Sequence, residues 1–335
     1  MEPTREAGRL RRRDLGVVGL GAAGLGLARS GALRAQAAWP DRPVRLVVPF
    51  GPGGAIDTLS RTVANAFPAQ ANGQSLVVEN RGGAGGTIAG AAVAQARPDG
   101  TTLMMADLGA NAIGQEMARL TYDPTRAFQA VCHLVNLPLV LLVPADSPAR
   151  DVAGLQKLAR EKPDLPYAHP GIGYAGHLAQ ELMMRQLGVR MVPVPYRSGA
   201  EVVRSLLSKE TDSGFITVST SLPFIREGKI RALAVGSTKP VAALPGVPPL
   251  AETLPGFEAV VWHGIVGPAG LPPDVTAAAN RVFNAVLRQP EVRQSVEQVQ
   301  AGEVVGGTPE EFAAFIRGQT ERWTPVIRAA GIKAE

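Results

Sequence analysis

Residues 44–57, VRLVVPFGPGGAID, join a short apolar run to a helical pattern through a glycine-rich turn. The run Val44–Val48 is apolar and rich in β-branched residues, which predicts a buried strand, and a helix is expected from about Asp57 to Phe67. The same order of strand, loop and helix returns through residues 76–106. There we expect strands at Leu76–Glu79 and Leu103–Ala106, and a helix at Thr87–Gln95. This alternation predicts parallel βαβ units with right-handed crossovers.

A second α/β set follows, and the chain after Val266 is expected to be helical. Strands are expected at Leu139–Val143, Leu165–Ala168, Val189–Tyr196, Gly214–Thr217, Ile230–Val235 and Val260–Val266. Helices are expected at Val152–Arg160, His177–Leu187, Ala200–Leu207, Pro272–Leu287 and Glu291–Val299, and a last helix follows Thr308, which has the capping-box spacing to Glu311. We therefore predict two doubly wound α/β lobes joined by a hinge. Lobe I is expected to comprise residues 38–140 and 265–335, and lobe II residues 141–264.

The first 37 residues have the three parts of a secretory signal. RRRDL at residues 11–15 is basic, residues 16–28 are apolar, and AQA at residues 35–37 fits a cleavage site. The paired arginines resemble the twin-arginine export motif, and an ordinary basic signal is the alternative. No later segment is long and apolar enough to cross a bilayer. The sequence therefore predicts a soluble, exported protein of the periplasm that begins near Ala38.

Charge and cysteine content exclude further classes of protein. Of 34 basic and 29 acidic residues, seven and three lie in the first 37 positions, so the chain after the signal holds 27 and 26. A nucleic-acid-binding face needs a basic excess that survives processing, so no nucleic-acid partner is expected. The single cysteine, Cys132, lies in an apolar run and cannot form an intrachain disulfide. An exported chain of this size is then expected to be held by its own hydrophobic cores.

The loop after the first strand is a candidate anion site. Its candidate ligand-binding residues are Phe50, Gly53, Gly54 and Asp57. Ligands of open α/β sheets bind outside the carboxyl ends of the strands, where glycines expose backbone N–H groups and a helix start favours an anion. Such a start contributes about 0.3–1 kcal/mol per charge, whereas micromolar binding requires about 8 kcal/mol, so several loops must converge. For Asp57, a role as helix cap is the alternative.

Two further loops between strands and helices carry candidate residues. They are His169, Gly173, Tyr174 and His177 in one loop, and Tyr196 and Ser198 in the other. Surface or capping roles are the alternative for the histidines. The four histidines of the chain have neither HExxH nor HxxEH spacing, so no metal and no cofactor is expected. A Gly-x-Ser-x-Gly elbow is also absent from the sequence, and we expect no catalytic residue and no enzyme.

Short segments along the whole chain after the signal resemble one known family. They are WPDRPV (39–44), VPFGPGGAID (48–57), VENRGGAGG (78–86), ARPDGTTL (96–103), YDP (122–124), VPY (194–196), GKIRALAV (228–235), LPGVP (244–248) and GPAG (267–270). With these segments the chain resembles the Bug family, the substrate-binding receptors of tripartite tricarboxylate transporters.

The resemblance implies a type II periplasmic-binding-protein fold that closes on its ligand by a hinge motion. It also implies an extracytoplasmic solute-binding protein that captures a small carboxylate, such as a dicarboxylate, a tricarboxylate or an aromatic acid, between its lobes. Its implied partners are this ligand and the subunits of a membrane transporter, and a monomer is expected. A periplasmic sensor that presents its bound state to a signalling receptor is the alternative. The implied pocket loops are Phe50–Asp57, the turn after Met105, His169–His177 and Tyr196–Gly199.

Three positions depart from the pattern that the resemblance implies. His169 and Tyr174 stand where the family usually has small hydroxyl residues. Asp107, in the turn after Met105, would repel a ligand carboxylate placed beside it unless it were protonated or paired. We therefore predict either a ligand that is aromatic or less acidic than usual, or a ring that fills the pocket.

Overall fold

The computed structural model describes residues 39–333, so the predicted signal at residues 1–37 lies outside the described residues. The described chain forms a ten-stranded sheet with the order β2-β1-β3-β9-β4-β7-β5-β6, and β8 and β10 also pair with β4. The strands are β1 Val44–Val48, β2 Leu76–Asn80, β3 Thr102–Ala106, β4 Phe128–Pro144, β5 Pro166–His169, β6 Val192–Pro195, β7 Ser213–Thr217, β8 Ile230–Val235, β9 Val260–Pro268 and β10 Glu303–Gly306.

Helices pack around this sheet. They are α1 Ala55–Ala66, α2 Thr87–Ala94, α3 Gly114–Met117, α4 Val152–Glu161, α5 Ala175–Leu187, α6 Gly199–Ser208, α7 Val218–Arg226, α8 Pro273–Leu287, α9 Pro290–Gln294 and α10 Pro309–Ala330, with π-helical turns at Gly109–Ile113 and Ser295–Val299. Within residues 39–333, no helix combines the length and the apolar composition that crossing a membrane requires.

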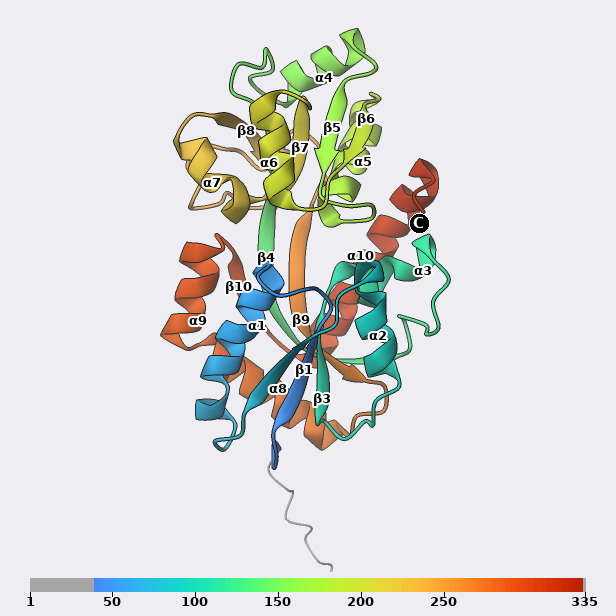
Figure 1. Cartoon of the computed structure of the whole chain (residues 1–335), viewed down its shortest axis with the longest axis vertical. Coiled ribbons are helices and arrows are strands. Elements are labelled where there is room, and N and C mark those ends of the chain that lie inside the picture. The colour runs from blue at the N-terminus through green and yellow to red at the C-terminus, as the bar shows by residue number, and fades with distance from the viewer. Residues whose placement is uncertain (1–38, 334–335) are drawn as a thin grey trace, which may run out of the picture. The chain divides into compact units, whose positions relative to one another are not determined.

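The long strand β4 connects two parts of the sheet (Figure 1). Residues up to Pro138 pair with β9, and residues from Leu139 onward pair with β7 and β8. We call the part built on β1, β2, β3, β9 and β10 lobe I, and the part built on β5–β8 lobe II. The predicted lobe boundaries at 140/141 and 264/265 fall inside β4 and β9, and the exact division stays a prediction.

The predicted parallel units are present in both lobes. In lobe I, β1 is parallel to β2 and β3, and in lobe II, β5 is parallel to β6 and β7. The edge strand β6 contains Pro193 and Pro195, which fits an edge because proline donates no ladder hydrogen bond. Each lobe has its own apolar cluster, and a third cluster includes residues of both lobes together with α10.

Helix α10 packs against both lobe I and lobe II. It begins at the predicted capping box, where Thr308 accepts from the Glu311 amide and the Glu311 carboxylate accepts from the Thr308 amide. Its apolar side packs on β4, and it contacts α5 of lobe II. There Arg185 donates to the carbonyl of Pro325 at 3.4 Å.

Three predictions of secondary structure are wrong. β4 starts at Phe128 rather than at Leu139, because Pro138 lies within the strand at the crossing between the lobes instead of ending it. No helix was expected between Thr217 and Ile230, where α7 lies, and its Ser, Thr and Pro223 resemble turn residues. The chain after Val266 is not wholly helical, because β10 adds an antiparallel strand to β4.

Candidate functional site

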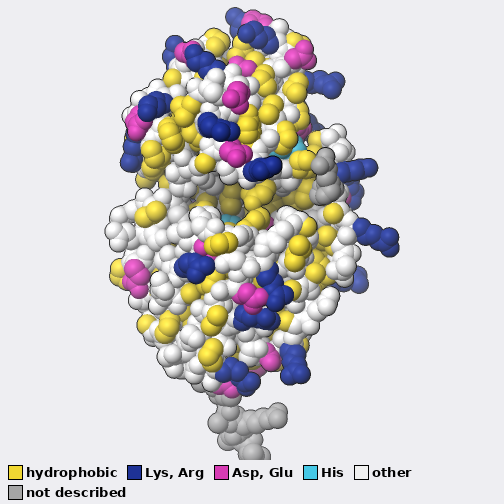
Figure 2. All heavy atoms as spheres, viewed as in Figure 1, with side chains coloured by type: hydrophobic (Ala, Val, Ile, Leu, Met, Phe, Trp, Pro, Cys, Tyr) yellow, Lys and Arg dark blue, Asp and Glu magenta, His cyan; other side chains and the backbone are white. Residues whose placement is uncertain are grey.

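A cavity of about 70 Å³ lies between lobe I and lobe II. It is lined from lobe I by Phe50, Gly85, Asp107, Leu108, Gly109, Met117, Val261, Trp262 and His263, and from lobe II by Ile172, Gly173, Tyr174 and Ala175. Figure 2 shows the molecule hollowed between the lobes, with mostly hydrophobic side chains in the hollow. We call this space the interlobe cavity. Both lobes therefore supply its walls, as a ligand that holds two lobes together requires.

Two contacts close the interlobe cavity from opposite sides. The rings of Phe50 and Tyr174 pack across the gap with their centroids 5.8 Å apart. Gly173, at φ 74°, lies so close to Met117 of lobe I that a Cβ on Gly173 would collide with the Met117 sulfur. A larger ligand therefore needs the lobes to part at these two contacts before it can enter.

Two helices begin at the interlobe cavity without a side-chain cap. Helix α2 starts directly after Gly86, at φ 90°, and α5 starts at Ala175 after Tyr174. No side chain of the N-cap residue accepts from the first N–H groups of either helix, although the Thr87 amide of α2 already donates to the Ala84 carbonyl of the preceding turn. Together with the helix dipoles, these N–H groups favour a negatively charged ligand group.

Asp107 brings a carboxylate into the wall of the same cavity. Its side chain is 7% exposed and accepts from the amides of Gly109 at 3.1 Å and Ala110 at 3.2 Å. Its own amide donates to the Asn111 side chain at 3.0 Å. Burial raises the pKa of Asp107 to about 7, and the two amide hydrogen bonds only partly oppose this rise.

Asp57 lies away from the interlobe cavity and is bound within lobe I. Its carboxylate accepts from Arg61 at 3.0 Å, from Asn80 at 2.9 Å and from the Gly53 amide at 2.9 Å. The bond from Arg61 is the main reason why the pKa of Asp57 falls to about 2. Because these partners occupy both carboxylate oxygens, the geometry favours the alternative of a capping role, at the third helical position rather than at the N-cap.

His169 and His177 form a buried stacked pair behind the cavity loop. Their ring centroids are 4.0 Å apart, and the Gly173 amide donates to Nδ1 of His177 at 3.2 Å. Nε2 of His177 lies 3.8 Å from Glu181, which accepts a hydrogen bond from the Tyr167 hydroxyl. Burial, with a smaller contribution from His169, lowers the pKa of His177 to about 3, so both rings are neutral at pH 7 and support the loop.

The structure brings together four of the predicted site residues. Phe50, Asp107, Gly173 and Tyr174 line the interlobe cavity. The cavity lining does not include the other seven, which are Gly53, Gly54, Asp57, His169, His177, Tyr196 and Ser198. Ser198 caps α6 by accepting from the Glu201 amide, and the Tyr196 hydroxyl donates to Glu210. Direct ligand contacts of all eleven residues stay a prediction.

Sequence reasoning missed the lining residues that β9 and α3 supply. Val261, Trp262 and His263 come from a strand, and Met117 ends a short helix, so none of them lies in a glycine-rich loop. The indole N–H of Trp262 is buried without a hydrogen-bond partner. The adjacent Trp262 and His263 within a predicted strand, VVWHG, were the available signal.

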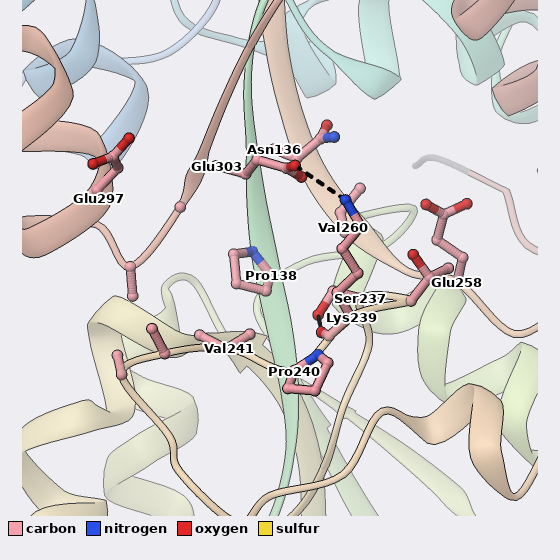
Figure 3. A pocket seen from close by; sticks show the side chains of 15 residues that line it. Asn136, Pro138, Ser237, Lys239, Pro240, Val241, Glu258, Val260, Glu297 and Glu303 are labelled. Atoms are coloured by element: carbon pink, nitrogen blue, oxygen red, sulfur yellow. Dashed lines mark hydrogen bonds and ion pairs between the residues drawn. The ribbon is translucent and has the colours of Figure 1, made fainter.

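A larger pocket, of about 430 Å³, lies beside the crossing of β4 between the lobes (Figure 3). Each of its three glutamates has a basic partner: Lys239–Glu303 at 3.7 Å, Arg322–Glu258 at 2.8 Å and Arg293–Glu297 at 2.5 Å. The protein thus pairs each carboxylate of this pocket with a cation, while Oδ1 of Asn136, which also lines it, is buried without a hydrogen-bond partner. The described residues also contain no group of three or more His, Cys, Asp or Glu side chains arranged to hold a metal ion.

Comparison with known proteins gives consistent matches. The model of the tripartite tricarboxylate transporter family receptor matches residues 59–332. A UPF0065 protein in the tcbD–tcbE intergenic region of Pseudomonas sp. strain P51 is 37% identical, over 89% of this chain and 90% of its own. Protein BugT of Bordetella pertussis strain Tohama I is 30% identical, over 88% of this chain and 91% of its own.

Solved structures show the same similarity. A Rhodopseudomonas palustris protein solved with adipate has a TM-score of 0.77 and 32% identity, covering 88% of this chain and 99% of its own. The protein MatC of the same organism, solved with bound malate, has a TM-score of 0.74 and 30% identity, covering 86% and 100%. The predicted α/β fold of periplasmic binding proteins is thereby confirmed.

Proposed function

Because this chain belongs to the Bug family of tripartite tricarboxylate transporter receptors, we propose that it captures a small carboxylic acid in the interlobe cavity. The protein then delivers the acid in the periplasm to a membrane transporter of the tripartite tricarboxylate type. Ligand capture rather than a reaction is its role.

One observation carries the proposal: uncapped helix starts from both lobes meet at one cavity. α2 belongs to lobe I and α5 to lobe II, and Gly85 and Ala175 at these starts line the cavity. A carboxylate beside Ala175 accepts from the first N–H groups of α5, which have no partner within that helix, while at α2 the Thr87 amide already donates to the Ala84 carbonyl. The acids found with the two solved relatives support a carboxylate as the class of ligand.

Apolar side chains provide the remaining binding energy. Leu108, Met117 and Val261 line the cavity beside the Phe50 and Tyr174 rings. Each partly buried helix start contributes at most about 2 kcal/mol, whereas micromolar binding requires about 8 kcal/mol. Burial of apolar surface supplies about 25 cal/mol per Å², so closure of both lobes on the carbon skeleton has to provide the difference.

The test is a calorimetric titration of the purified protein with mono-, di- and tricarboxylic acids and with the neutral amide of each acid. We expect at least one acid to bind and its amide to bind more than tenfold more weakly, because the amide lacks the charge that the helix starts favour. An acid at about 100 times its Kd should also stabilise the protein by about 2.7 kcal/mol in a melt. If no acid binds, or if amides bind as well as acids, the proposal is wrong.

A matched pair of glycine variants tests closure. Gly173 and Gly188 both have positive φ, at 74° and 63°, and both flank α5, so alanine strains the backbone similarly at each. Only at Gly173 does the added methyl group meet Met117 of the opposite lobe, while nothing lies within 4 Å at Gly188. Gly173→Ala should therefore weaken acid binding at least tenfold, and Gly188→Ala should leave it unchanged. Equal effects would contradict capture by closure.

A further inference from the structure

The helix starts and the Asp107 carboxylate at the interlobe cavity bind different ligand groups. At α2 and α5 the first N–H groups have no side-chain cap. At the helical turn after β3, Asp107 caps the amides of Gly109 and Ala110 with its own carboxylate. A ligand carboxylate therefore has N–H groups to bind at the start of α5, whereas beside the start of α2 Asp107 already supplies the anion, since a Cβ on Gly86 would lie 3.2 Å from its Oδ1.

No positive charge of the protein balances this carboxylate. The cavity lining contains no Lys or Arg, and its titratable side chains are Asp107, Tyr174 and His263. Burial lowers the pKa of His263 to about 4, so its ring is neutral at pH 7. Asp107 thus has two backbone N–H donors but no cation among the described residues. A carboxylate that is 7% exposed has little water around it and gains from a further hydrogen-bond donor.

Asp107 also lies close to the glycines through which a ligand would approach. A Cβ on Gly86 would lie 3.2 Å from Oδ1 of Asp107, and a Cβ on Gly109 would lie 3.3 Å from Oδ2. The α2 loop packs directly on this side of the carboxylate, because a Cβ on Gly109 would also collide with the Gly85 carbonyl oxygen, so a ligand can reach only the part of Asp107 that lines the interlobe cavity. A ligand group in the cavity beside Gly85 and Gly109 therefore meets an acceptor, not a donor.

We propose that Asp107 determines specificity, and that the ligand is a monocarboxylic acid whose opposite end donates a hydrogen bond to Asp107 through a hydroxyl or ammonium group. The inference rests on the proposed function, since it assigns the second end of the acid that the cavity captures. A dicarboxylate of the same length is rejected, because its second carboxylate faces Asp107 with no cation between them. The ligand class includes both hydroxyl and ammonium groups, because the Asp107 carboxylate can accept a hydrogen bond from a neutral or a cationic donor.

The experiment compares acids that share a skeleton and differ at one end. Calorimetric titrations at pH 8 use a six-carbon series of hexanoate, 6-hydroxyhexanoate, 6-aminohexanoate and adipate, and an aromatic series of benzoate, 4-hydroxybenzoate, 4-(aminomethyl)benzoate and terephthalate. In the series that fits the cavity, we expect a donor-ended acid to bind at least about tenfold more tightly than the diacid. In Asp107→Asn this preference should fall at least about tenfold, because the amide no longer repels a carboxylate.

Two controls keep the result interpretable. Asp107→Thr retains an oxygen that can accept from the Gly109 or Ala110 amide, so it replaces Asp107→Asn if the latter does not melt cooperatively. Asp123→Asn alters an exposed aspartate that accepts from Thr125, and it should leave all preferences unchanged. Diacids that bind more tightly than donor-ended acids, or a preference that Asp107→Asn and Asp107→Thr leave intact, would overturn the inference while the proposed function stands. Binding by no acid of either series or of the wider panel would overturn both.

Discussion

Asp57 and Asp107 are two buried aspartates of lobe I that each follow a strand and lie at the start of a helix. Their side chains are 3% and 7% exposed. Asp57 has a cation and an amide side chain as partners, and its pKa falls to about 2, mainly through Arg61. Asp107 has only backbone amides, and burial raises its pKa to about 7. The same residue type in the same local setting thus has opposite electrostatic environments.

The difference separates a structural carboxylate from one kept for recognition. Asp57 ties the loop Phe50–Gly54 to α1 and to Asn80 of β2, so its interactions are complete without a ligand. Asp107 faces a cavity, and its ionised form is disfavoured until a donor reaches it. A buried ionisable group that the protein itself leaves unbalanced, inside a cavity shared by two lobes, is a better indicator of a binding site than burial or position alone.

The largest expected effect is on stability, at Asp57. Asp57→Ala should lower the free energy of unfolding by about 2–3 kcal/mol, because it leaves the Gly53 amide and Asn80 without their acceptor. Arg61 is 53% exposed and can return to water, so Arg61→Ala should cost less than about 1 kcal/mol. Urea denaturation at pH 7 measures both variants. Equal losses would mean that the ion pair, and not the buried hydrogen bonds, is what Asp57 contributes.

Substitution of Asp107 should change the free energy of unfolding in the opposite direction. Asp107→Asn at pH 8 should raise the free energy of unfolding by about 1 kcal/mol, because the desolvation that the neutral amide avoids outweighs the hydrogen bond from Gly109 or Ala110 that its NH2 group cannot accept. The folded protein holds the Asp107 proton more tightly than the unfolded chain, so stability from this group is greatest below pH 4 and declines as the pH rises to about 7. Asp57, with its lowered pKa, loses its contribution as the pH falls from about 4 to about 2.

Melts of the wild type and of Asp107→Asn between pH 4 and pH 8 separate these contributions. The wild type should lose stability relative to the variant across this range and reach a constant difference above about pH 7. A difference that does not change with pH would show that Asp107 has an ordinary pKa and is not disfavoured in its ionised form. In that case Asp107, like Asp57, would have a structural capping role that is complete without a ligand.

The histidine pair of lobe II resembles Asp57, because its partners all come from the protein. His177 stays neutral beside His169, Glu181 and Tyr167, and its pKa is lowered to about 3. The unfolded chain therefore binds this proton more readily, and stability from His177 is present above about pH 6.5 and lost as the pH falls toward 3. His177→Gln should weaken this acid dependence and change stability at pH 7.5 by only about 1 kcal/mol. Thermal denaturation of the wild type and of His177→Gln from pH 4 to 7.5 measures this dependence. If both proteins lose the same stability as the pH falls, this account is wrong.

Much of the fold was predictable because periodicity and capping are local signals. The β-branched run at Val44–Val48 and the capping box at Thr308 act over a few residues, and both are as expected. The extent of β4 was not, because Pro138 normally ends a strand and is tolerated here only where the strand passes between two sets of partners. That condition depends on tertiary structure, which local patterns do not contain.

The candidate site was only partly predictable for the same reason. Loop glycines and ring residues pointed to Phe50, Gly173 and Tyr174, which line the interlobe cavity, and their contact with a ligand stays a prediction. Sequence alone could not separate Asp57 from Asp107, because Asn80 lies 23 residues away from Asp57 in the chain and only the folded sheet brings them together. Asp107 was recognised as unfavourable for a carboxylate ligand, but the absence of Lys and Arg from the cavity lining depends on how the two lobes pack.

The smallest expected effect concerns an aspartate outside both environments. Asp146 pairs with Lys209 on the surface of lobe II, and both side chains are 63% exposed. Water and salt screen this pair, so Asp146→Asn should shift the melting temperature by no more than the measurement error, and acid binding should not change. Calorimetric melts in low and high salt test this directly. A clear decrease in the melting temperature would mean that ion pairing rather than burial decides how much an aspartate contributes to stability. The distinction between Asp57 and Asp107 would then need a different physical basis.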